Sequence, residues 1–133
     1  MALVWLDHVN VRTADLAAMS RFYEDVLGLP RGERPSFGFG GAWHYCGARA
    51  AVHLVEVARA PEGLEPRIEH FAFRAEGLAA FLDNLRRHGV PYRIAVVPGS
   101  GVRQVNVEDP DGNHIEIQFA ADEDAGPAVP RGG

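Results

Sequence analysis

Residues 67–74, RIEHFAFR, form the stretch that decides the fold we expect for this chain. The pattern is typical of a short strand with a histidine, His70, at its centre. A similar stretch, LDHVNVR at residues 6–12, lies earlier in the chain, with His8 placed 62 residues before His70. An amphipathic helix is predicted after each copy. This self-similarity at a fixed offset indicates a repeated structural module, because two sets of weak signals then agree.

The first module begins with a predicted strand over residues 4–12, in which His8 and Asn10 share a face. Asp15 is a suitable N-cap for the helix that follows, and Gly28 marks its end. Three short strands punctuated by glycine are then predicted at residues 35–38, 42–46 and 50–57.

The second module repeats this order. Its strand at residues 67–74 is followed by a helix that closes at His88 and Gly89, much as the first helix closes at Gly28. The turn DPDG at residues 109–112 leads into the last strand. Three strands after the helix are predicted at residues 92–97, 103–108 and 113–119.

These patterns predict an α+β fold made of two paired β-α-β-β-β modules, which form a curled mixed sheet around a metal-site cavity. We expect one domain over residues 1–120, because a chain of 133 residues suits a single core. Module one spans residues 4–57, module two spans residues 67–120, and a proline-containing linker joins them at residues 58–66. The small, acidic residues 121–133 are expected to form a flexible tail.

The composition excludes several classes of function. A net charge of −5 and a pI near 5.6 give no electrostatic reason to bind nucleic acid or an anionic membrane. The first residues lack the basic region and long apolar run of a signal peptide, so we expect a cytoplasmic protein. Cys46 is the single cysteine, which excludes an internal disulfide and a thiolate zinc site. The chain has no lysine, which excludes Schiff-base chemistry.

Candidate functional residues emerge when the two modules are aligned. The last strand of each module then places His53 opposite Glu116, in addition to the pair His8 and His70. Each of the four is a polar side chain between apolar neighbours, where burial without a partner would be costly. We predict a divalent metal (Fe2+, Mn2+, Co2+, Ni2+ or Zn2+), because imidazole and carboxylate donors without thiolate suit these ions. Its predicted ligands, of which the last two are also the predicted catalytic groups, are His8, His70, Glu116 and His53.

Other roles stay open for several residues. A single strand histidine is often structural, and His53 could equally orient a ligand or contact the substrate. His44 shares a face with Cys46 and either lines a pocket or packs in the core. His114 lies two residues before Glu116, on the same face of the predicted strand, but it is beside a turn. The candidate substrate contacts, each with an ordinary surface role as the alternative, are Asn10, Arg103 and Asn106.

The chain resembles the vicinal oxygen chelate superfamily, also called the glyoxalase/bleomycin-resistance/dioxygenase family, over residues 4–119. The matching pieces are DHVNV at residues 7–11, RFYEDVLGL at 21–29, EHFAF at 69–73 and DPDGNHIE at 109–116. The resemblance implies paired modules around a cavity, a divalent metal, a small-molecule substrate and usually a homodimer. It maps the family's ligands onto His8, His70 and Glu116, with His53 at the variable fourth position.

Three functional hypotheses follow from this resemblance. We favour a metal-dependent enzyme that chelates a small substrate through adjacent oxygens, with dioxygenase-like chemistry ahead because the ligands form a facial triad. A glyoxalase- or epimerase-type lyase or isomerase is the alternative, although glyoxalase I generally has a glutamate where His53 stands. The third is a metal-free drug-binding protein like the bleomycin-resistance members, whose cavity usually lacks such ligands.

Overall fold

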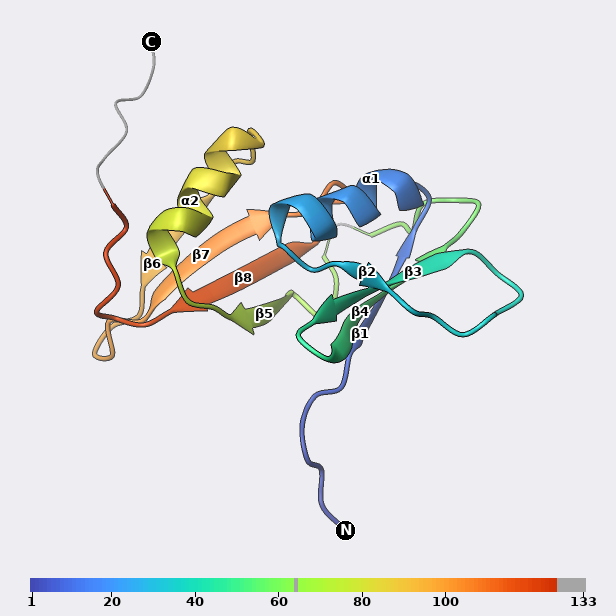
Figure 1. Cartoon of the computed structure of the whole chain (residues 1–133), viewed down its shortest axis with the longest axis horizontal. Helices are drawn as coiled ribbons and strands as arrows, with labels where there is room; N and C mark the ends of the chain where they lie inside the picture. Colours follow the sequence, from blue (N-terminus) through green and yellow to red (C-terminus); the bar gives the residue numbers. More distant parts are fainter. Residues whose placement is uncertain (64, 127–133) are drawn as a thin grey trace. The chain divides into compact units, whose positions relative to one another are not determined.

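The computed structural model describes residues 1–63 and 65–126, and the chain forms two compact units, Met1–Glu65 and Pro66–Gly133. Each unit contains one β-α-β-β-β module, so the predicted α+β fold is confirmed (Figure 1). The single domain expected over the two modules stays a prediction. Of the expected tail, residues 127–133 lie outside the described part of the chain. Within that part, neither helix has the length and apolar character needed to cross a membrane.

The first unit folds as a four-stranded mixed sheet. Its elements are β1 (Val9–Thr13), α1 (Leu16–Arg21), the π-helical turn η1 (Phe22–Val26), β2 (Arg31–Gly32), β3 (Gly41–Cys46) and β4 (Arg49–Glu56). The strand order is β1-β4-β3-β2, with β1 parallel to β4 and the other neighbours antiparallel. The first helix begins as predicted, because the Asp15 side chain accepts a hydrogen bond from the Ala18 N–H at 3.1 Å.

The second unit has the same arrangement. Its elements are β5 (His70–Arg74), α2 (Leu78–Arg87), β6 (Arg93–Val96), β7 (Arg103–Glu108) and β8 (His114–Phe119). The strand order is β5-β8-β7-β6, and again the first and last strands of the module are parallel neighbours. Two separate four-stranded sheets are therefore present, one from each module.

The strand registers repeat from one module to the other. In the first unit, His53 of β4 pairs with Asn10 of β1. In the second unit, Glu116 of β8 pairs with Ala72 of β5 in the same parallel arrangement. His53 and Glu116 therefore occupy equivalent positions in the two sheets, as the alignment of the modules predicts.

Both N-terminal strands begin later than the sequence pattern indicates. β1 begins at Val9 and β5 begins at His70. β5 cannot pair earlier, because its parallel neighbour β8 itself begins at His114, the partner of His70. Asp7 and Glu69 therefore lie just outside the strands, where the alternation of side chains between two faces does not apply to them.

The strand predicted at residues 35–38 is wrong. The edge strand of the first sheet is instead β2, which pairs with β3. The ring of Tyr45 lies against β2 at Gly32, where an added Cβ would be 2.6 Å from a ring carbon. Residues 35–38 instead contain a local hydrogen bond, typical of a γ-turn, from the Phe37 N–H to the Pro35 carbonyl oxygen at 2.9 Å.

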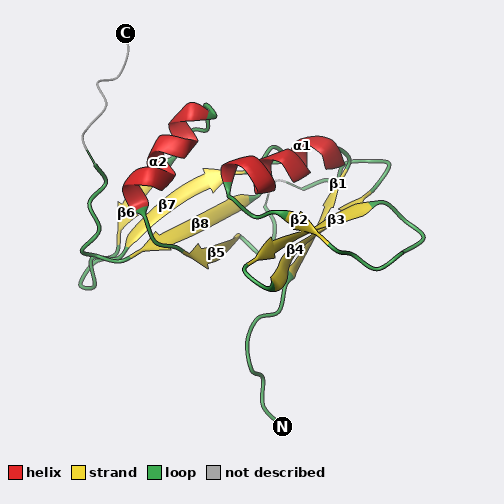
Figure 2. Ribbon diagram, viewed as in Figure 1, coloured by secondary structure: helices red, strands yellow, loops and turns green. Residues whose placement is uncertain are grey.

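The helix of each module lies over one face of its own sheet (Figure 2), and the residues buried between them are apolar. Met19 of α1 and Leu54 of β4 are fully buried in the first unit. Leu82 of α2 and Ile115 of β8 have the same role in the second. Because side chains alternate along a strand, His53 of β4 and the residues His114, Glu116 and Gln118 of β8 lie on the opposite face. The candidate site is built there.

His44 belongs to the core of the first unit, which settles its alternatives in favour of packing. It has no exposed surface. Its Nδ1–H donates to the Leu29 carbonyl oxygen at 2.7 Å, so Nε2 accepts from the Ser20 hydroxyl at 2.8 Å. Cys46, in contrast, is exposed.

We expect His44→Ala to lower the free energy of unfolding by about 2–4 kcal/mol, since it opens a cavity and leaves a buried hydroxyl unpaired. Urea denaturation measures the change. His88→Ala, at the exposed end of α2, is the matched control and should cost less than about 1 kcal/mol. Equal losses in the two variants would contradict the structural role of His44.

Candidate metal centre

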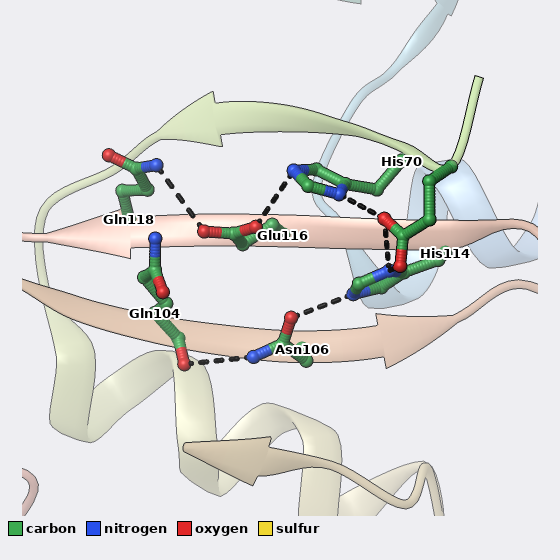
Figure 3. Close-up of polar contacts among 7 residues, drawn as sticks. His70, Gln104, Asn106, His114, Glu116 and Gln118 are labelled. Carbon is green, nitrogen blue, oxygen red and sulfur yellow. Dashed lines mark hydrogen bonds and ion pairs between the residues drawn. The ribbon is translucent and has the colours of Figure 1, made fainter. Parts of the chain in front are cut away.

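The polar face of the second sheet carries His70 and Glu116, two of the predicted ligands (Figure 3). His70 begins β5, and Glu116 lies two residues along β8 from the partner of His70. His70 Nε2 is 3.0 Å from Glu116 Oε2. Glu116 is only 6% exposed, and Gln118 Nε2 donates to its other oxygen at 3.4 Å. A buried carboxylate here faces a histidine.

Both ring nitrogens of His70 face carboxylates. Nδ1 contacts Glu69 Oε2, and Nε2 contacts Glu116 Oε2. A neutral imidazole carries one N–H and can donate to only one of them. Its other nitrogen then points a lone pair at an anionic oxygen, which is unfavourable unless a proton or a metal cation lies between them. The donors of the second module therefore fit a divalent cation at Nε2.

A further cluster on this face surrounds His114. Its Nδ1 lies 3.1 Å from Glu69 Oε1, and its Nε2 lies 2.7 Å from Asn106 Oδ1. Glu69, His70 and His114 each offer a ligand atom within 4.8 Å of the others, so this trio could also hold an ion. Strand alternation would place Glu69 and His70 on opposite faces, which hides the trio in the sequence. The signal that could have found it is the register that sets His114 opposite His70.

His8 and His53 lie against each other in a stack of three rings in the first unit. The His8 and His53 ring centroids are 3.8 Å apart, with 12° between the planes. Trp43 stacks on His53 with a spacing of 3.9 Å and an angle of 10°. The His53 Nε2–H donates to the Ala50 carbonyl oxygen at 2.9 Å, which leaves the lone pair on Nδ1.

The stack limits what His53 can do. An imidazole lone pair lies in the plane of its ring, so parallel rings 3.8 Å apart cannot both aim at one ion. Ligation of a single ion by His8 and His53 together would require one ring to leave the stack. The stacked geometry favours a place for His53 beside a ligand, as a proton acceptor or a substrate contact.

Burial and hydrogen bonding shift three pKa values at the site. Burial, followed by the nearby His8, lowers the pKa of His53, so its imidazole is neutral at neutral pH. The hydrogen bond with His8 lowers the pKa of the Asp7 carboxyl. In the second unit, the hydrogen bond with His70 is the main cause that lowers the pKa of Glu69. Both carboxyls therefore stay anionic well into the acid range.

An open hollow of about 340 Å³ adjoins His53 in the first unit. Its walls include Trp5, Trp43 and Tyr45. The guanidinium carbon of Arg49 lies 4.3 Å from the centre of the Trp5 ring. Flat aromatic walls with a cation at the rim suit a planar group.

The three candidate substrate residues have different surroundings. Asn10 is exposed and pairs with His53 across the ladder. Asn106 is 8% exposed and bonded to His114 on the polar face. Arg103 lies, by strand alternation, on the other face of its sheet, with the buried valines of β7. Asn10 and Asn106 are thus beside the candidate ligands of their own units.

We expect NMR titration of the metal-free protein to give His53 a pKa below 6.5, its ordinary value, and His8→Ala to raise it. Since the folded pKa is lower than the unfolded one, the unfolded chain binds more protons in this window. Stability is then full above pH 6.5 and declines as the pH falls toward the folded pKa. The urea midpoints of the wild type and of His53→Gln, each measured above pH 6.5 and again below it, test this change in stability. A His53 pKa at or above the ordinary value would contradict the prediction.

The chain is similar to one known protein family, to a curated relative and to several solved structures. A model of the Glyoxalase/Bleomycin resistance protein/Dioxygenase superfamily matches residues 5–117. Glyoxylase I 4 from Arabidopsis thaliana is 32% identical over 123 residues, covering 86% of this chain and 70% of that protein. A solved structure from Bacillus anthracis, assigned to the glyoxalase family, has a TM-score of 0.75 at 23% identity, over 90% of this chain and 98% of that one. Lactoylglutathione lyase from Agrobacterium tumefaciens has a TM-score of 0.65 at 20% identity, over 86% and 92%.

Proposed function

We propose that this chain, which belongs to the Glyoxalase/Bleomycin resistance protein/Dioxygenase superfamily, is an enzyme that uses a divalent metal ion to act on a small molecule. The proposed ligands are His8, His70 and Glu116, and His53 is the fourth group, as a ligand or as a proton acceptor. Fe2+, Mn2+, Co2+, Ni2+ and Zn2+ all suit these donors. A homodimer and a cytoplasmic location stay predictions.

The main support is the position of His70 Nε2, 3.0 Å from the buried Glu116 Oε2. Burial of a carboxylate is costly without a compensating positive charge. Among the described residues, Glu116 forms an ion pair with His70, and the other ring nitrogen of His70 already contacts Glu69. A divalent cation would compensate Glu116 and accept the His70 lone pair at once.

The residues of the chain can hold a substrate and move its protons. When bound, the ion would act as a Lewis acid that holds two adjacent substrate oxygens and stabilises negative charge on them. Glu116 supplies a carboxylate that can accept a proton. His53 supplies a second acceptor at Nδ1, because its Nε2–H is donated to Ala50 and burial lowers its pKa.

Dioxygenase-like chemistry is the reaction type we favour within the superfamily. Two histidines and one carboxylate are the facial donor set of non-haem iron enzymes. The aromatic hollow beside His53 supports a planar substrate, because Trp43 and Tyr45 offer flat surfaces there. Asn10 and Asn106 are the proposed polar contacts, since both lie next to the candidate ligands.

Glyoxalase-type lyase or isomerase chemistry is the second candidate. It is supported by the 32% identity to Glyoxylase I 4. Such chemistry moves a proton between two carbon atoms of the substrate, and it needs a side chain of the protein that acts as the base. Where glyoxalase I generally has a glutamate, this chain has His53, whose lowered pKa leaves it neutral and able to accept that proton.

We expect His8→Ala, His70→Ala and Glu116→Gln each to weaken metal binding more than about 100-fold. Loss of a ligand should cost more than loss of a residue hydrogen-bonded to a ligand, which typically lowers metal affinity about 10–100-fold. Elemental analysis of protein purified without added ions, and competition with a chelator, measure the change. His88→Ala is the control. Wild-type affinity in the His8 and His70 variants would show that the ligand set is wrong, and a metal-free wild type would favour a drug-binding function.

Oxygen consumption with catechols, after anaerobic loading with Fe2+, tests the favoured reaction beside an assay with a hemithioacetal. We expect turnover of a catechol, and a loss of at least about 100-fold in Glu116→Gln, the lower range for removal of a proton-transfer group. His88→Ala should keep wild-type rates. Activity with the hemithioacetal alone would select the lyase or isomerase alternative.

A further inference from the structure

We infer that Asp7 and Glu69 are positioning residues that hold His8 and His70 with Nε2 presented to the metal; the inference rests on the proposed function. An acidic residue directly precedes the histidine in both modules, so the pair recurs at the same offset of 62 residues as the histidines. The Asp7 Oδ2 accepts from His8 Nδ1 at 2.7 Å. Glu69 Oε2 contacts His70 Nδ1 in the same way.

The late start of β1 and β5 makes these contacts possible. Neighbouring residues in a regular strand point to opposite faces, so one side chain cannot reach the ring of the next. β1 begins only at Val9, after His8, and β5 begins at His70 itself. The alternation of side chains between the two faces of a strand therefore does not apply to Asp7 and Glu69. Each of their carboxylates can contact the imidazole ring of the histidine that follows it.

The contact decides which nitrogen of each ring can bind a cation. A carboxylate on Nδ1 stabilises the tautomer with its proton there, which leaves the lone pair on Nε2. His70 Nε2 is the nitrogen that lies 3.0 Å from Glu116 Oε2. The anion also makes the ring a stronger donor, as carboxylates behind metal-bound histidines do. Without Glu69, rotation and the other tautomer would compete with this arrangement.

Glu69 is held more firmly than Asp7. Its carboxylate also contacts His114 Nδ1, at 3.1 Å and 3.2 Å for the two oxygens. His114 Nε2 donates to Asn106 Oδ1 at 2.7 Å, so the ring can also donate Nδ1–H to Glu69 only when both of its nitrogens carry a proton. We therefore expect the Glu69 side chain, which contacts two histidines, to contribute more to ligand positioning than the Asp7 side chain, which contacts His8; the two carboxylates are similarly exposed, at 70% and 78%.

The test compares Asp7→Asn and Glu69→Gln with the wild type in the full chain. An amide removes the charge and can turn its NH2 group toward Nδ1, which favours the wrong tautomer. Competition with a chelator for Zn2+ should show binding about 10–100-fold weaker in each variant, with the larger loss in Glu69→Gln. Asp7→Glu and Glu69→Asp, which keep the carboxylate, should bind closer to wild type than the amides.

Nitrogen-15 NMR of the imidazoles in the metal-free protein gives a second readout that a merely structural role would not move. The wild type should show His8 and His70 protonated at Nδ1, and each amide variant should lose this preference at its own histidine. The matched controls are Asp122→Asn and Glu76→Gln, both exposed and in the same unit as His70. Neither should change the Zn2+ affinity or the tautomers.

Two results would overturn the inference without touching the proposed function. The first is wild-type Zn2+ affinity in both amide variants while His70→Ala loses the metal. The second is an unchanged tautomer at His8 and His70 in the amide variants. Failure of the wild type to bind metal would instead overturn the proposed function first.

Discussion

The alternation of side chains along the strands governs the structure of each module. One face of every sheet is apolar and lies under a helix, with residues such as Leu54 and Ile115 fully buried. Side chains one residue out of step with these lie on the other face, while His44, a polar residue of β3, is hydrogen-bonded within the core. His53 and Glu116 stand on that face at the middle of β4 and β8. The packing of the core thus determines the face on which the proposed catalytic groups lie.

The two modules use equivalent positions in different ways. Glu116 is a buried carboxylate that lies 3.0 Å from the Nε2 atom of His70, an arrangement that fits the proposed cation. His53 is a buried neutral ring, and its partners are two other rings, His8 and Trp43. One module therefore offers charge to an ion, while the other offers an uncharged, flat surface with a proton acceptor at its edge.

Much of this arrangement is visible in the sequence, because the offset between modules survives small errors in strand boundaries. That is why His53 and Glu116 could be matched. The starts of β1 and β5 could not be predicted, since residues 67–74 alternate whether or not a neighbouring strand is present to pair with them. The stack on His53 was also hidden, because it depends on the register of β3, which shifts after His44.

Each module carries one histidine where its first strand begins and one polar group in its last strand. A module joined to a copy of itself would present the same two groups twice, at the four positions that this chain uses, so the chain has the form that duplication and fusion of one unit would leave. Once fused, the copies no longer had to share a residue at the second position. Glu116 and His53 differ in this way, so the charge at one of the two equivalent positions can change while the other is kept.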